Sequence, residues 1–191
     1  MSYFKQLHDL PILDLEKELN QMFSKKLLSW GNGNQICVNT LPTHPDDYFI
    51  GVGSLWLDWD NKKEIKLSDG SIEYDISERE NPREETDFSI LCNVFRDTLF
   101  EEIYLSLKSK YTLGRIRLMK MKPKTCLSWH QDVCNRIHFP IKTEPGCLMI
   151  IDNEVKHMPK NTWWYTNTFP YHTAINASKL ERIHLVCSVE S

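Results

Sequence analysis

The chain has 191 residues, a length typical of one domain, and a net charge of -3, which gives no electrostatic footprint for nucleic acid or an anionic membrane. Hydrophobic residues make up 41% and charged residues 26%, as in ordinary globular proteins. No apolar run approaches the roughly 18 residues of a membrane span, and the first residues are too polar for a secretory signal. We therefore expect a cytoplasmic protein without nucleic-acid or membrane partners.

The first elements along the chain are a helix, a strand and a hairpin. Apolar residues recur at helical spacing over residues 13–30, which predicts an amphipathic helix. Residues 49–57 have the composition of a strand. The alternating runs 65–67 and 72–76 flank Asp69-Gly70, and this pattern indicates a β-hairpin.

A charged loop and a second helix complete the first half of the chain. Residues 77–85 are charged and contain a proline, so we expect a surface loop. Residues 86–110 show one apolar helical face, and Thr86 or Asp87 could cap this helix. Residues 1–110 would thus form a helical and β flank, whose candidate roles are a lid or a docking surface.

The second half of the chain changes to short strands. The predicted strands cover residues 113–121, 136–141, 147–151, 162–165 and 182–189. Short strands at this spacing are typical of a jelly roll. The expected fold is mainly β with flanking helices (α+β), in one domain over 1–191, with a double-stranded β-helix (jelly-roll or cupin-like) core over 111–191.

The six cysteines indicate neither a zinc site nor a redox motif, because none forms a C-x-x-C pair. We expect reduced and mostly buried thiols.

The first chemical motif is His130-Gln131-Asp132. In an extended segment residues i and i+2 face the same way, so an imidazole and a carboxylate here can reach one ion. Together with a distant second imidazole they would form the facial triad of non-haem iron(II) oxygenases, which leaves three coordination positions open. The motif alone is weak, because a strand-end ion pair has the same pattern.

The second imidazole is assigned to His172 because an arginine follows it. Arg182 comes ten residues later, in an apolar strand, where a buried guanidinium can bind a carboxylate through two hydrogen bonds. The competing ligand is His157, which has no arginine at comparable spacing and lies among exposed turn residues. We therefore predict a triad of His130, Asp132 and His172.

Arg136 and His138 share one face of their predicted strand, with apolar residues on the other. If the apolar face packs into a second layer, the polar face lines a cavity; otherwise this is an edge strand with its polar face in water. The aromatic run 163–165 could wall the same cavity or belong to the core.

In order and spacing these motifs resemble the aspartyl/asparaginyl β-hydroxylase family of 2-oxoglutarate oxygenases, including its branch of free-proline hydroxylases. The resemblance covers residues 113–189 and rests on the strand beginning Arg115-Ile116-Arg117-Leu118, on His130-Gln131-Asp132, on Arg136 to Ile141, on Trp163-Trp164-Tyr165, on His172 with Asn176, and on Arg182 to Val186. The first 110 residues show no such resemblance.

The resemblance implies a jelly roll in which His130, Asp132 and His172 ligate iron(II) and Arg182 binds 2-oxoglutarate. It also implies that Arg136 and His138 contact the co-substrate or the substrate. Family members with aspartyl hydroxylase activity in animals lack the carboxylate ligand, and so do the superfamily's halogenases. Asp132 therefore favours hydroxylation and the proline-hydroxylase branch. Ser188 stands where nucleic-acid demethylases carry a second arginine.

The predicted activity is hydroxylation of an unactivated C–H bond in an amino acid or amino-acid residue, with iron(II), 2-oxoglutarate and dioxygen as cofactors. The substrate could be a free amino acid, a peptide or a protein. Two alternatives remain open: a jelly-roll module that binds its ligand without turnover, and a cupin dioxygenase that needs no 2-oxoglutarate.

Overall fold

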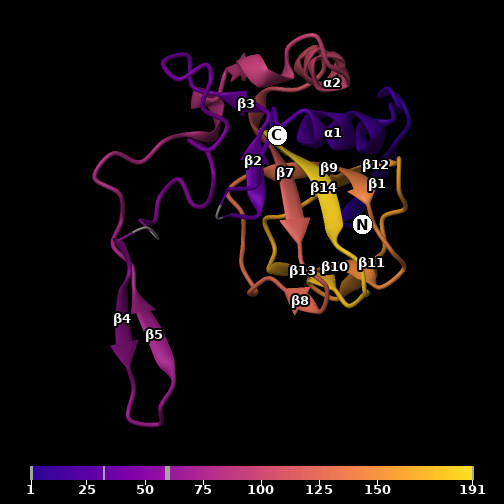
Figure 1. Cartoon of the computed structure of the whole chain (residues 1–191). Coiled ribbons are helices and arrows are strands. Elements are labelled where there is room, and N and C mark those ends of the chain that lie inside the picture. The colour runs from indigo at the N-terminus through magenta and orange to yellow at the C-terminus, as the bar shows by residue number, and fades with distance from the viewer. Residues whose placement is uncertain (1, 32, 59–60, 191) are drawn as a thin grey trace.

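Two antiparallel sheets form a jelly roll in the computed structural model, which describes residues 2–31, 33–58 and 61–190 (Figure 1). The larger sheet contains, in order, β1 (Phe4–Leu7), β12 (Trp163–Thr166), β9 (Asn135–Lys142), β14 (Arg182–Val189), β7 (Leu113–Met121) and β2 (Gln35–Cys37). The smaller sheet contains β11 (Glu154–Lys156), β10 (Cys147–Ile151), β13 (His172–Asn176) and β8 (Thr125–Cys126). The predicted jelly-roll fold is confirmed.

The outer face of the larger sheet carries the main hydrophobic core. Alternation along the central strands puts Ile137, Phe139 and Ile141 of β9 on this face, together with Leu185 of β14. The helices α1 (Leu15–Ser24) and α2 (Leu99–Lys108) cover it with their apolar stripes (Figure 1). Each fully buried aliphatic or aromatic side chain here contributes roughly 1.5–3 kcal/mol.

The inner face of the larger sheet is polar, and it faces the smaller sheet. Trp164 from this face packs with Met149 and Ile151 of β10 in a second apolar cluster, which closes one side of the interior. The inner positions of β9 and β14 instead carry buried arginines and histidines. This arrangement confirms that the polar face of β9 does not lie in water.

A two-stranded hairpin extends away from the rest of the molecule (Figure 1). It pairs β4 (Lys63–Lys66) with β5 (Ile72–Asp75), as the Asp-Gly signal predicts, and Gly70 in its turn has a φ of 85°. Every residue of the two strands is exposed. A shorter pair, β3 (Asn39–Thr40) with β6 (Ile90–Leu91), lies beside the jelly roll.

The strand predicted at residues 49–57 is wrong, because these residues form turns. The Asp47 carboxylate accepts hydrogen bonds from the backbone N–H groups of Phe49 and Ile50, which bends the chain. The carbonyls of Gly51 and Gly53 accept from the Arg115 guanidinium rather than from a neighbouring strand. The apolar composition of residues 49–57 therefore reflects turns and not a strand.

The helix predicted at residues 86–110 is also wrong in its first half. The structure has a 3₁₀ turn, η2 (Glu85–Asp87), then β6, a second 3₁₀ turn, η3 (Asn93–Phe95), and only then α2. Asp97 has a φ of 58°, which separates η3 from α2, and Thr98 caps α2 through its hydroxyl. The helix predicted at 13–30 is likewise shorter, as α1.

Five of the six cysteines are buried and all are free thiols, as predicted, and Cys126 is exposed. In the part of the chain that the structure describes, no helix has the length and hydropathy needed to cross a membrane.

Candidate metal centre

His130, Asp132 and His172 meet at one end of the interior. Their potential ligand atoms all lie within 4.8 Å of one another. The segment before β9 runs antiparallel to the start of β13, because His130 and His172 exchange backbone N–H···O hydrogen bonds of 3.1 and 2.8 Å. The i, i+2 spacing then places Asp132 on the same side as His130. Among the described residues these three form the one such cluster of His, Cys, Asp or Glu.

Backbone carbonyls fix the orientation of both imidazole rings. His130 Nδ1 donates to the carbonyl of Ser128 (2.8 Å), and His172 Nδ1 donates to the carbonyl of Pro170 (3.0 Å). A carbonyl can only accept, so each Nδ1 carries a proton and Nε2 is left to bind a metal. The two rings lie close together, with centroids 4.3 Å apart. The donor set of two imidazoles and one carboxylate suits iron(II).

Arg136 holds the carboxylate of Asp132. Its Nε donates to Asp132 Oδ2 at 2.8 Å, and His172 Nε2 lies 3.5 Å from the same oxygen. Burial by itself would raise the pKa of the Asp132 carboxyl, but the neighbouring His172 ring and the hydrogen bond and charge of Arg136 outweigh burial and hold the pKa well below its ordinary value. Asp132 is therefore ionised and available as a ligand at neutral pH.

Arg182 is buried on β14, and no acidic side chain among the described residues pairs with it. Its Nη1 contacts Met121 Sδ (3.2 Å), its Nη2 donates to His184 Nδ1 (3.0 Å), and its Nε has no partner. Burial lowers the pKa of this guanidinium to about 10. A buried cation without an anion is costly, so the site is suited to a carboxylate that comes from a ligand.

His138 lies on β9, and its ring is next to that of His184, with centroids 5.9 Å apart. The charges of Arg182, Arg136 and Asp132 all act on this ring. Neither ring nitrogen has a hydrogen-bond partner among the residues that the structure describes, although His138 is only 6% exposed. Burial, together with the charges of Arg182 and Arg136, lowers the pKa of His138 to about 3, so the ring is neutral.

Three further residues of interest, His157, Trp163 and Ser188, are not part of the cluster of His130, Asp132 and His172. His157 donates through Nδ1 to the carbonyl of Cys147 and is not part of the cluster. Trp163 packs on Phe139 in the main core, with ring centroids 4.6 Å apart, rather than walling the site. Ser188 is buried and its hydroxyl contacts Arg136.

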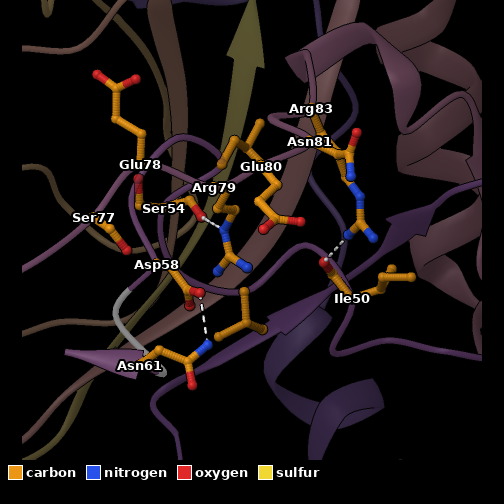
Figure 2. Close-up of a pocket in the computed structure, with 12 residues that line it drawn as sticks. Ile50, Ser54, Asp58, Asn61, Ser77, Glu78, Arg79, Glu80, Asn81 and Arg83 are labelled. Atoms are coloured by element: carbon orange, nitrogen blue, oxygen red, sulfur yellow. Dashed lines mark hydrogen bonds between the residues drawn. The ribbon is translucent and has the colours of Figure 1, made fainter.

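A cavity of about 520 Å³ lies away from these residues, at the root of the β4–β5 hairpin (Figure 2). Charged and amide side chains point into it, and Arg83 donates to the carbonyl of Ile50 in its wall (2.9 Å). None of the six predicted site residues lines this cavity.

Glu85 is an element of the site's surroundings that the sequence did not reveal. It was expected in a surface loop, yet it is 9% exposed and bound to Arg115 and Arg136. The available signal was indirect: Arg115, Arg117 and Arg136 occupy inward-facing strand positions and need a buried counter-charge.

Comparison with known proteins gives one family and several remote structural likenesses. The sequence model of the aspartyl/asparaginyl beta-hydroxylase family matches residues 76–191, which is more than half of the chain. The match starts before residue 111, so the expectation that the first 110 residues show no resemblance is corrected for residues 76–110. No curated protein matches the sequence.

Three solved structures illustrate the structural likenesses. AviO1 from Streptomyces viridochromogenes is 12% identical, with a TM-score of 0.46, over 98% of this chain and 89% of that one. A 2OG-Fe(II) oxygenase family protein from Burkholderia pseudomallei is 14% identical, with a TM-score of 0.39, over 68% and 72% of the two chains. A cupin domain from Bordetella pertussis is 15% identical, with a TM-score of 0.36, over 40% and 81%. From the family match, this chain belongs to the aspartyl/asparaginyl β-hydroxylase family.

Proposed function

We propose that this chain is an iron(II)- and 2-oxoglutarate-dependent dioxygenase that hydroxylates an unactivated C–H bond of an amino acid or amino-acid residue. The observation that carries the proposal is the combination of an oriented His130, Asp132 and His172 cluster with the buried cation of Arg182, which has no acidic partner in the described part of the chain. A structural ion pair would explain the cluster but would leave a buried arginine without an anion.

In this proposal the three clustered residues hold the metal, and Arg182 pairs with the distal carboxylate of 2-oxoglutarate through its planar donors. When bound, iron(II) and 2-oxoglutarate supply the activation of dioxygen, and the co-substrate ends as succinate and carbon dioxide. His138 stays neutral and can donate one hydrogen bond and accept another beside the co-substrate. The buried polar wall around it excludes water from the reacting groups.

Arg136 has a different role in this proposal from the one that the sequence predicted. Its hydrogen bonds go to protein groups, namely Asp132, Glu85, Cys134 and Ser188. These contacts support a role in holding Asp132 rather than in binding the substrate or co-substrate.

The test is succinate release over free amino acids and peptides, with mass detection of a gain of one oxygen atom in the substrate. The His130→Ala variant should release no succinate above background, because the metal loses a ligand. The His157→Ala variant is the matched control and should retain activity, since His157 lies outside the cluster. Product formation without consumption of 2-oxoglutarate would favour a cupin dioxygenase, and ligand binding without turnover would favour a binding module.

A further inference from the structure

A buried carboxylate from outside the jelly roll reaches the surroundings of the metal centre. Glu85 belongs to the 3₁₀ turn η2, and Arg115 on β7 binds it through both carboxylate oxygens. Glu85 Oε2 accepts from Arg115 Nε (2.9 Å) and from the Arg115 backbone N–H (3.0 Å), and Oε1 accepts from Arg115 Nη2 (2.9 Å). These three bonds fix the position of the carboxylate.

The same carboxylate is linked to Asp132 through Arg136. Glu85 Oε1 also accepts from Arg136 Nη1 at 3.2 Å, while Arg136 Nε donates to Asp132 Oδ2 at 2.8 Å. Arg136 is 5% exposed, so solvent screens neither bond strongly. A continuous series of charged hydrogen bonds therefore runs from Arg115 through Glu85 and Arg136 to Asp132.

Gly114 on β7 has no side chain, and this leaves the space that Glu85 occupies. A Cβ atom on Gly114 would lie 2.6 Å from the Cβ of Glu85 and 2.9 Å from the Cβ of Ser188. Both distances are shorter than a van der Waals contact allows, so any larger residue at position 114 would displace Glu85 or β14. The close approach of η2 to β7 depends on this glycine.

We infer that Glu85 is a positioning residue for the metal centre, which acts through Arg136 on the carboxylate of Asp132. Without Glu85, the other partners of Arg136 besides Asp132 would be the uncharged Cys134 and Ser188, and the full positive charge of the guanidinium would oppose a dication. Glu85 anchors the guanidinium from the other side and offsets this charge. The inference rests on the proposed function, because it takes Asp132 as a metal ligand.

The experiment measures Co(II) affinity of the full chain by visible absorption titration, which needs neither substrate nor turnover. The Glu85→Gln variant keeps the shape of the side chain but loses the charge. Its affinity should fall about 10-fold, the low end of the range for a direct partner of a metal ligand, because Glu85 acts on Asp132 through Arg136. The Gly114→Ala variant should also lose affinity without a change in any charged group, since its methyl group displaces Glu85 or Ser188, both of which contact Arg136. Far-UV circular dichroism and thermal unfolding establish that each variant is folded.

Two controls separate positioning from general destabilisation. Ile103→Val removes one methyl group from the core under α2, away from the site, and should leave the Co(II) affinity unchanged. In an Arg136→Met background, Glu85→Gln should alter the affinity by less than about two-fold, because coupled residues do not act additively.

The outcomes distinguish this inference from the proposed function. Wild-type protein that does not bind Co(II) would overturn both. If the wild type binds Co(II), and folded Glu85→Gln and Gly114→Ala bind it equally well, the inference alone fails. It also fails if Glu85→Gln weakens binding to the same extent with and without Arg136.

Discussion

Arg182 is buried and positively charged, and within residues 2–31, 33–58 and 61–190 it has no acidic partner. A buried charge of this kind lowers the stability of the ligand-free protein. Binding of an anion removes this destabilisation. Its neighbours Met121 and His184 satisfy part of the guanidinium without neutralising it. We therefore expect Arg182 to favour ligand binding and to destabilise the ligand-free protein.

The Arg182→Met variant tests both effects, on stability and on 2-oxoglutarate binding. Metal-free Arg182→Met should be more stable than the wild type by about 1 kcal/mol or more, because an uncompensated buried charge is removed. Its KM for 2-oxoglutarate should rise about 30-fold or more, since losing one partner of a buried charge pair costs about 2 kcal/mol at least. Urea denaturation and succinate-release kinetics measure the two effects. A destabilised variant with unchanged KM would make Arg182 a structural residue.

The buried histidine His138 makes stability depend on pH. Its folded pKa of about 3 lies below the ordinary value of 6.5. As the pH falls through 6.5 the unfolded chain binds a proton that the folded chain does not, so stability is lost with decreasing pH until about pH 3. Burial also holds the pKa of His184 well below its ordinary value, and this acts in the same direction.

The expected loss for His138 approaches about 1.4 kcal/mol per pH unit below pH 6.5. Denaturation of metal-free protein at pH 7.0, 6.0 and 5.5 would measure it. The His138→Asn variant should show a shallower dependence on pH than the wild type. An equally steep dependence in His138→Asn would mean that the ring is protonated in the folded state or does not control this loss.

At the level of elements, the strands that position the site could be predicted and the connections before them could not. Strands β7, β9 and β14 alternate apolar and polar residues because one face packs under the helices and the other lines the interior. The segment before α2 misled the prediction because Phe88, Leu91 and Phe95 are spaced by three and four residues, as in a helix. They are buried from turns and a short strand instead.

A matched pair of threonines tests where α2 begins. Thr98 accepts a hydrogen bond from the backbone N–H of Phe100, whereas Thr86, at the start of the predicted longer helix, is exposed. Thr98→Ala should lower the free energy of unfolding by about 1 kcal/mol, the usual effect of losing a helix cap. Thr86→Ala should change it by less than about 0.5 kcal/mol, as for most surface substitutions. Equal losses in chemical denaturation would contradict the observed boundary.

Across the whole molecule, the candidate site draws on both halves of the chain. The proximity of His130, Asp132 and His172 and the burial of Arg182 could be predicted, because their order and spacing lie within residues 130–182 and follow the strand pattern. Glu85 was not, because its contacts with Arg115 and Arg136 span 30 and 51 positions and depend on how η2 packs against β7. The N-terminal strands β1 and β2 likewise complete the edges of the larger sheet.

The proposed function requires that His130, Asp132, His172 and Arg182 together bind iron(II) and 2-oxoglutarate. Anaerobic titration of wild-type protein with both should produce a visible metal-to-ligand charge-transfer band that saturates at one equivalent of each. The His172→Ala variant should lose the band, and His157→Ala should keep it. Absence of the band in wild-type protein, or an unchanged band in His172→Ala, would contradict the assignment.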